Sequence, residues 1–353
     1  MPAEASDASN TLEPWEQETW LENVKMLQLE CFARTLLKLK RISNTRCCNR
    51  GTGLFLTFVF IYVTLKDVRK NSKVISETKA DPETSNTTAS LGSKVLPKCI
   101  IIGVRKGGTR ALLEMLTLHP SIKMAPQEVH FFDNDTNYRR GYSWYLSQMP
   151  ATEAGQIAME KSPSYLVTAA VAERIKAMDP AIQLLVIVRE PVTRLVSDFT
   201  QISHNRQERG LKTRTFDETM IKEDGSINVD YYGVTTGLYS EHLEHWYKFF
   251  PRNQIHIVNG DRLIKTPWRE VSKIENFLGL PHFVKENNFY FNSTKGFHCL
   301  RPETGQARCL AKSKGRPHVN VSANTVKLLR KFYTPHNLKF YSLVGTDFGW
   351  PED

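Results

Sequence analysis

The segment Ile100–Leu113, IIIGVRKGGTRALL, carries the residues best suited to binding a phosphate group. An apolar strand leads into a glycine-rich turn and then a helix, which directs successive backbone N–H groups into one concavity at the positive end of the helix. Two glycines let an anion approach the backbone closely, and a lysine, a hydroxyl and an arginine surround them. The anion-binding residues that we predict are Lys106, Gly107, Gly108, Thr109 and Arg110.

This turn departs from GxxxxGK[ST], the phosphate-binding pattern of nucleoside triphosphatases. The lysine precedes the glycine pair, and no lysine stands before Thr109. The buried run Gln183–Val188 ends in Arg189, where such an enzyme would place a magnesium-binding Asp. These departures argue against the alternative of an ATP-dependent nucleotide kinase and favour a site that holds phosphate through protein cations, without a metal.

A second group of reactive residues lies in EVHFFD, which places Glu128, His130 and Asp133 within six residues. A hydroxyl group that attacks an electrophile at neutral pH needs a positioned base, and Glu128 is a candidate. If the segment is extended, Glu128, His130 and Phe132 share one face, and Asp133 orients a partner or a substrate amine. A metal site is the alternative, but no second His/Cys cluster completes it.

Alternating strands and helices after residue 98 must position these groups. We predict strands at Cys99–Gly103, Gln183–Val188 and Gln254–Val258, and a further short strand that ends at Glu160. We predict helices at Thr109–His119, Ala169–Met178, Pro191–His204, Leu238–Phe250 and Val271–Leu278. This alternation is typical of an α/β domain in which a parallel sheet is flanked by helices. Ligands bind such a sheet at the carboxyl ends of its strands, where Lys161 and Arg189 stand.

Composition agrees with a folded chain that binds an anionic partner. The 353 residues contain 47 Lys and Arg against 37 Asp and Glu, a formal net charge of +10. An apolar content of 41% excludes a chain that is disordered throughout. Six cysteines in this length do not form a disulfide scaffold, so the core must stabilise the fold.

The N-terminal part of the chain has a different organisation. An apolar run begins at residue 51, too late for a cleaved signal peptide, and basic residues are slightly more numerous before it than after it. We therefore predict a cytosolic segment (1–50), a single-pass transmembrane signal anchor (51–66), a flexible lumenal stem (67–97) and a lumenal catalytic domain (98–353). A buried core helix is the alternative for the short apolar run. Sequons at Asn86, Asn134, Asn292 and Asn320 are open to glycosylation if this side is lumenal.

The motifs GVRKGGTR, EVHFFD, EKSPSY, REPVTRLVSDFTQ and CLAKSKGR, in this order, closely resemble the heparan sulfate glucosamine 3-O-sulfotransferases. The resemblance covers about residues 97–352, and in its motifs the chain resembles the type 1 and type 5 members most. It implies a P-loop-like sulfotransferase fold, 3′-phosphoadenosine 5′-phosphosulfate (PAPS) as co-substrate with no metal, and heparan sulfate as acceptor. It also implies a type II Golgi membrane protein whose catalytic domain is lumenal and which binds no nucleic acid.

The resemblance assigns roles to residues of this sequence. The 5′-phosphosulfate loop falls on residues 106–110, and the 3′-phosphate contacts fall on Arg189 and Ser197. A second cofactor-binding segment comprises Lys314, Gly315, Arg316, Pro317 and His318. The base falls on Glu128, and the heparan-binding positions fall on Arg105, Arg110, Lys161, Gln201, Lys314 and Arg316. The motif neighbours of Glu128 and Lys161 join the substrate site: Val129, His130, Phe131, Phe132, Asp133, Ser162, Pro163 and Ser164.

Sulfuryl transfer suits these residues. Negative charge grows on the bridging oxygen as the nucleotide phosphate leaves, so a cation such as Lys106 acts selectively in the transition state. A heparan-binding membrane protein that kept the fold but lost catalysis is the alternative. In an oxidising lumen Cys299 and Cys309 are expected to form a disulfide near SKGR. Family members commonly carry Tyr before the first of these cysteines, whereas this chain has His298.

Overall fold

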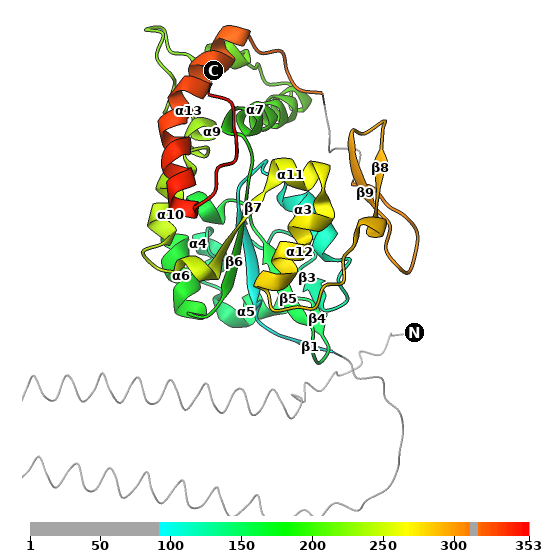
Figure 1. Ribbon diagram of the computed structural model, residues 1–353. Helices are drawn as coiled ribbons and strands as arrows, with labels where there is room; N and C mark the ends of the chain where they lie inside the picture. The colour runs from blue at the N-terminus through cyan, green and yellow to red at the C-terminus, as the bar shows by residue number, and fades with distance from the viewer. Residues whose placement is uncertain (1–91, 311–316, 353) are drawn as a thin grey trace, which may run out of the picture. The chain divides into compact units, whose positions relative to one another are not determined.

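A five-stranded parallel sheet lies at the centre of the computed structural model, which describes residues 92–310 and 317–352 (Figure 1). Its strands run in the order β3 (Ile122–Met124), β5 (Ile157–Lys161), β2 (Cys99–Gly103), β6 (Gln183–Val188) and β7 (Ile255–Asn259). All four neighbouring pairs are parallel. The apolar runs in β2 and β6 are buried on both faces, as expected for inner strands of a parallel sheet.

Helices cover both faces of this sheet. Along β2, Ile100 and Ile102 pack into one core cluster, while Cys99 and Ile101 pack into another, because successive strand residues face opposite sides. The first cluster is covered by α5 (Gly141–Ser147), α6 (Ala169–Met178), α10 (Tyr239–Trp246) and α13 (Ala323–Val344). The second is covered by α3 (Thr109–Leu116), α11 (Gly260–Lys265) and α12 (Pro267–Phe277). The predicted α/β fold with a parallel central sheet is confirmed.

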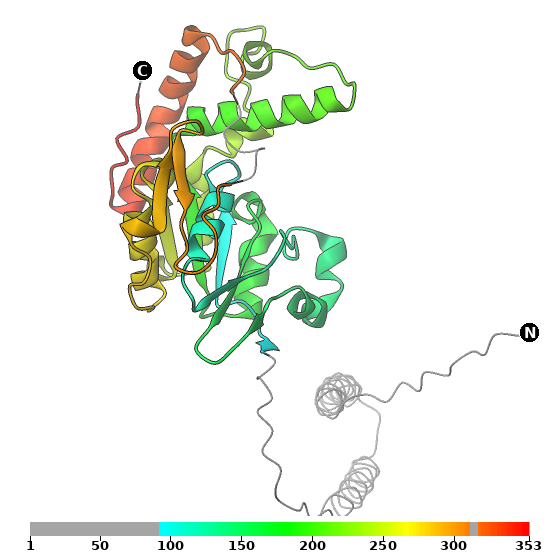
Figure 2. The same cartoon turned by 90° about the vertical axis from the view of Figure 1, so that its right-hand side faces the viewer.

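The longest helix next to the site, α7 (Pro191–Glu208), crosses above the carboxyl ends of the strands (Figure 2). Glu190 caps its first turn by accepting hydrogen bonds from the backbone N–H groups of Val192 and Thr193. A third core cluster joins α7 to α8 (Phe216–Met220), α9 (Tyr232–Thr235) and α13. Residues that follow β6 are thereby held over the strand ends.

The remaining elements are short. They are β1 (Ser93–Lys94), α4 (Asp135–Tyr138), β4 (Ala151–Thr152), β8 (Phe289–Asn292), β9 (Phe297–Leu300) and three 3₁₀ turns at Tyr165–Val167, Arg252–Gln254 and Glu286–Asn288. β1 pairs with β4, so backbone pairing begins upstream of the predicted domain start at residue 98. β8 and β9 form an antiparallel hairpin beside α11.

The predicted elements agree with the observed ones in most of the sheet. The strands at Cys99–Gly103 and Gln183–Val188 and the helix at Ala169–Met178 have the predicted bounds. The first helix ends at Leu116, before the predicted His119, and α7 continues past His204 to Glu208. β3 was not predicted, because three residues are too few to show a periodic pattern.

Several predictions fall outside the described residues. They concern the cytosolic segment, the anchor at 51–66, most of the stem, Asn86, and Lys314, Gly315 and Arg316 of the second cofactor-binding segment. Within residues 92–310 and 317–352, none of the helices combines the length and apolar character that a membrane crossing requires.

The predicted disulfide between Cys299 and Cys309 is present and links residues ten positions apart. Cys299 lies in β9, and Leu300 pairs with Arg308 in an isolated bridge, so the intervening loop is folded back on the hairpin. Cys99 is a buried thiol of the central strand, and burial raises its pKa.

Replacing Cys299 and Cys309 together by serine should lower the free energy of unfolding by about 3 kcal/mol, because the unfolded chain is no longer constrained by this loop. Urea unfolding of oxidised wild type and the double variant measures the difference. Reductant should destabilise the wild type and leave the double variant unchanged. If reductant destabilised both proteins equally, the prediction would be contradicted, because the effect would not come from the disulfide. The buried Cys99 is present in both proteins.

Candidate active site

The glycine-rich turn after β2 is held tightly against the end of β6. The Val104 N–H donates to the Ile187 carbonyl at 3.0 Å, and a Cβ atom on Gly107 would lie 2.4 Å from the same oxygen. Gly108 has a φ of +116°, which disfavours any other residue before the first turn of α3. The turn therefore requires both glycines and presents its backbone at the N-terminus of α3, as predicted.

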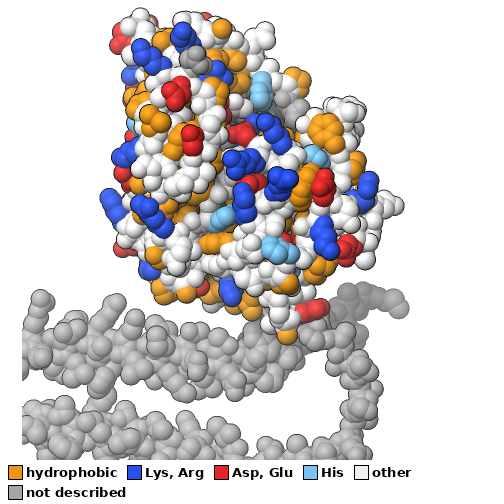
Figure 3. Space-filling model, viewed as in Figure 1, with side chains coloured by type: hydrophobic (Ala, Val, Ile, Leu, Met, Phe, Trp, Pro, Cys, Tyr) orange, Lys and Arg blue, Asp and Glu red, His pale blue; other side chains and the backbone are white. Residues whose placement is uncertain are grey.

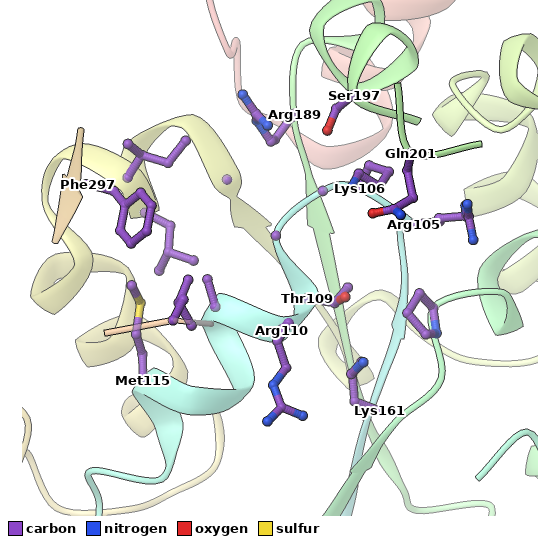
Figure 4. Close-up of a pocket in the computed structure, with 18 of the residues that line it drawn as sticks. Arg105, Lys106, Thr109, Arg110, Met115, Lys161, Arg189, Ser197, Gln201 and Phe297 are labelled. Atoms are coloured by element: carbon purple, nitrogen blue, oxygen red, sulfur yellow. The ribbon is translucent and has the colours of Figure 1, made fainter. Parts of the chain in front are cut away.

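Basic side chains from other segments meet at this turn. A cavity of about 620 Å³ is lined by Lys106, Arg189, Ser197 and His318, among others. Partial burial and the nearby positive charges of Arg189 and Lys106 lower the pKa of His318. Figure 4 shows Arg189, Ser197 and Lys106 at one end of the cavity, with Arg110 and Lys161 at the other. The arrangement suits a ligand with two separated anionic groups.

Arg189 is held in place from several directions. Its Nε lies 3.4 Å from Asp261 Oδ1, and its backbone carbonyl accepts a hydrogen bond from the Tyr239 hydroxyl at 2.9 Å. Asp261 also accepts from the backbone N–H of Glu190 at 3.1 Å and from the indole N–H of Trp350 at 3.2 Å. A residue from the C-terminal end of the chain thus contributes to the position of the arginine.

The predicted base lies on the opposite side of the cavity, in a network of charged groups. Glu128 forms an ion pair with Lys161, whose side chain is 4% exposed while that of Glu128 is 42% exposed. The other carboxylate oxygen of Glu128 is 3.3 Å from His130 Nε2. His130 Nδ1 lies 2.9 Å from Asp133 Oδ2, which also accepts from the Ser164 hydroxyl. Asp133 therefore contacts His130 directly, and its role in orienting a partner or a substrate amine stays a prediction.

These contacts change the protonation of both residues. Hydrogen bonds that the imidazolium donates, first to Asp133, which has the larger effect, and then to Glu128, raise the pKa of His130 to about 10. The hydrogen bond from His130 lowers the pKa of Glu128 to about 2; partial burial opposes this change and Lys161 reinforces it. Burial favours a higher pKa for Asp133, but hydrogen bonds from His130 and Ser164 outweigh it and lower the value. At neutral pH the site holds an ionised carboxylate between two cations.

The structure corrects part of the predicted substrate site. Phe131 and Phe132 are fully buried and Val129 is 7% exposed, so these side chains belong to the core and hold the loop. The expected alternation fails because His130 has a φ of +48°, which turns the chain out of an extended path. Ser162 is likewise fully buried. Pro163 and Ser164 line the cavity.

The remaining predicted acceptor residues are spread around the same opening. Arg105 Nε lies 2.7 Å from the buried Asp198, and Gln201 and Arg105 both line the cavity. Arg110 pairs with Glu114 at 2.6 Å. Figure 3 shows Lys and Arg side chains gathered between α7 and the β8–β9 hairpin. A second cavity, of about 660 Å³, adjoins the first at Arg110 and Lys161.

Other lining residues were not predicted, apart from His298, which the sequence singled out as standing where the family commonly carries Tyr. An apolar wall includes Met115, Leu263 and Phe297, and Figure 4 shows Met115 and Phe297 opposite Lys106. Arg308, from the disulfide loop, lines the second cavity. His298 lines the first cavity and is hydrogen-bonded to the carbonyl of Ile264 at 3.0 Å. No spacing signal marks these positions, because they lie in α3, in α11 and around the β8–β9 hairpin and meet only through tertiary packing.

Comparison with known proteins places this geometry in context. Residues 96–334 match the family described as the sulfotransferase domain. The human heparan sulfate glucosamine 3-O-sulfotransferase 5 is 49% identical over 257 residues, which is 72% of this chain and 74% of that protein. The human heparan sulfate glucosamine 3-O-sulfotransferase 3A1 is 46% identical over 276 residues, 77% of this chain and 66% of that protein.

A solved structure shares the fold at low sequence identity. The crystal structure of a sulfotransferase from Alicyclobacillus acidocaldarius superimposes with a TM-score of 0.54 at 19% identity, covering 72% of this chain and 98% of that one. This likeness supports the fold alone.

Replacing Asp133 by Asn should lower the pKa of His130 toward its ordinary value of about 6.5, because the largest stabilising contact of the imidazolium is lost. NMR titration of the histidine rings measures the change. Because the pKa of His130 is raised in the folded state, its imidazolium stabilises the folded protein fully below pH 6.5. This contribution is lost as the pH rises through about 10. Between these two pH values, the free energy of unfolding of Asp133→Asn should therefore fall less than that of the wild type.

A matched control is Asp135→Asn, which removes an equal charge two residues away. Asp135 pairs with Arg174 at 2.6 Å, so the His130 titration should stay as in the wild type. An equal shift in both variants would mean that general charge, and not the contact with Asp133, sets the protonation of His130.

Proposed function

The chain belongs to the heparan sulfate glucosamine 3-O-sulfotransferase family, and we propose that it transfers a sulfuryl group from PAPS to the 3-hydroxyl of a glucosamine residue in heparan sulfate. One observation carries the proposal: the anion-binding turn at Lys106 and the carboxylate of Glu128 line the same cavity. A donor bound at the turn would present its sulfur to an acceptor hydroxyl beside the carboxylate.

The donor end of the cavity fits PAPS in charge and shape. Lys106 and the backbone of residues 107–109 bind the phosphosulfate, and Arg189 with Ser197 binds the 3′-phosphate, at the opposite end from Lys161. The apolar wall that includes Met115 and Phe297 offers a surface on which a purine can pack. Because protein cations surround both anionic groups, the proposed reaction needs no metal.

Glu128 acts as the base in this proposal. Its carboxylate is ionised at neutral pH but is a weak base while His130 and Lys161 both contact it. An acceptor hydroxyl that takes the place of the lysine contact raises the basicity of Glu128 in part, while the larger effect, the hydrogen bond from His130, remains. It also releases the Lys161 ammonium toward the transferring sulfuryl group, whose charge it can stabilise.

The chemical step is a displacement at sulfur. The acceptor oxygen forms the new O–S bond, the bond from sulfur to the phosphate oxygen breaks, and the acceptor proton passes to Glu128. The electron pair of the broken bond stays on the leaving phosphate, and the charge that grows there is stabilised by Lys106 and the α3 N-terminus. The product nucleotide is 3′-phosphoadenosine 5′-phosphate.

The acceptor is a polyanion, and the second cavity extends the basic opening. Arg110 and Arg308 line it, and Lys161 lies where it meets the first cavity. We place the sugars that flank the reacting glucosamine along this opening. Binding through several exposed cations should weaken as salt concentration rises.

Glu128→Gln should reduce kcat by about 10²- to 10⁴-fold, because the amide cannot accept the hydroxyl proton. Transfer from radiolabelled PAPS to a defined heparan oligosaccharide measures it, and calorimetry with 3′-phosphoadenosine 5′-phosphate should show unchanged donor-site affinity. Glu244→Gln is the control, since Glu244 pairs with Lys339 at 2.8 Å on the protein surface. Transfer by Glu128→Gln at the wild-type rate would refute the assignment of Glu128 as the base. If the wild type itself showed no transfer, the alternative of an inactive heparan-binding protein would be favoured.

We also propose a type II Golgi location, which the apolar run at 51–66 and the disulfide support. In intact vesicles from cells that express the full chain, protease should remove an N-terminal epitope and spare the catalytic domain until detergent is added. The exposed Asn134 and Asn320 should carry glycans that N-glycosidase removes. Digestion of the catalytic domain without detergent would contradict this topology.

A further inference from the structure

The loop that carries Glu128 and His130 rests on two buried hydroxyl groups. The backbone N–H of His130 donates to Ser162 Oγ at 3.1 Å. The next two N–H groups, of Phe131 and Phe132, donate to the hydroxyl oxygen of Tyr165 at 2.9 and 3.4 Å. Three consecutive backbone donors of the loop are thus satisfied by side chains of the segment that follows β5.

Both hydroxyl groups meet at one buried carboxylate, that of Glu160. Ser162 Oγ donates to Glu160 Oε2 at 3.0 Å, and the Tyr165 hydroxyl interacts with the same carboxylate. A third hydroxyl, of Tyr145, donates to Glu160 Oε1 at 3.0 Å; its ring packs on Phe131 of the loop, but its hydroxyl receives none of these three N–H groups. All four side chains are fully buried.

The carboxylate determines which way the hydroxyl groups point. A hydroxyl has one proton to donate and two lone pairs that accept. When Ser162 donates to Glu160 and Tyr165 directs its proton toward the same carboxylate, the lone pairs of both hydroxyl groups face the loop and can receive its N–H groups. Burial raises the pKa of Glu160 to about 7, and hydrogen bonds from Ser162, Tyr145 and Tyr165 oppose that rise. In a dry interior such linked hydrogen bonds reinforce one another.

The backbone that these bonds hold is unusual. His130 has a φ of +48°, a conformation that costs a non-glycine residue free energy and persists only where its surroundings enforce it. It directs the imidazole so that one nitrogen reaches Glu128 and the other reaches Asp133. Without fixed partners for its N–H groups, the loop would relax and the imidazole would leave the two carboxylates.

We propose that Glu160 is a positioning residue, which acts through the hydroxyl groups of Ser162 and Tyr165 to hold His130, and through it Glu128, in the reactive arrangement. This inference rests on the proposed function of Glu128 as the base. Glu160 touches neither substrate in this proposal, because it is buried beneath the loop.

Two matched substitutions separate positioning from simple stability. Tyr165→Phe and Tyr145→Phe each delete one buried hydroxyl that contacts Glu160, but only the Tyr165 hydroxyl also receives N–H groups of the loop. We expect Tyr165→Phe to lower kcat about tenfold or more, with the KM for PAPS within about twofold, since small displacements of a catalytic group are costly. Tyr145→Phe should stay within about threefold of wild type in both.

A second readout does not depend on activity. NMR titration should show a lower pKa for His130 in Tyr165→Phe and in Ser162→Ala, and no change in Tyr145→Phe, because only the first two release the loop. Glu160→Gln keeps the size of the side chain but offers an amide N–H₂ to one hydroxyl donor, so it should behave as Ser162→Ala does. If Glu160→Gln fails to fold, the other variants decide the matter.

The outcomes are distinct. Equal losses of kcat in the two Tyr variants, in step with their melting temperatures, would overturn the inference. So would an unchanged kcat and His130 titration in Tyr165→Phe and Ser162→Ala. If Glu128→Gln instead proves fully active, the base assignment fails, while the His130 titration still reports whether Glu160 holds the loop.

Discussion

The ion pair between Glu128 and Lys161 depends on the parallel pairing of β3 with β5. Glu128 lies four residues after β3, Lys161 ends β5, and the register sets Met124 opposite Met159. A lysine that is 4% exposed needs an anion, because an unpaired buried charge is far more costly than the pair. Loss of this pairing would separate the proposed base from its nearest cation. The edge strand β3, only three residues long, is therefore as important to the site as the inner strands.

The proposed donor and acceptor halves of the cavity meet because β2 lies between β5 and β6. The turn after β2 faces Arg189 on one side and Lys161 on the other. Within the described part of the chain, the non-glycine residues with positive φ are Lys106 and His130, one on each side. Backbone strain of this kind collects where a fold must aim a side chain at a ligand. The site thus combines a regular sheet with two strained residues that the neighbouring packing holds in place.

Much of the fold was predictable because its signals are local. The buried run at Gln183–Val188 and the glycine pair at 107–108 act through neighbouring residues, and the structure has the strand and the turn there. The site was predictable only in part. Phe132 was predicted to share a face with Glu128, but the left-handed backbone at His130 directs its side chain into the core. The residue types in this segment do not indicate such a conformation. Contacts between distant segments, such as Arg308 at the second cavity, arise from packing that sequence spacing does not reveal.

The link from Trp350 through Asp261 to Arg189 ties the segment after α13 to the proposed donor pocket. Trp350 is 7% exposed and stacks on Phe340 of α13 with ring centroids 5.6 Å apart. A purification tag fused directly after residue 352 would therefore begin almost beside this indole. Placing the tag at the other end of the domain, or inserting a long spacer, avoids disturbing the proposed nucleotide site through a segment that itself lines neither cavity.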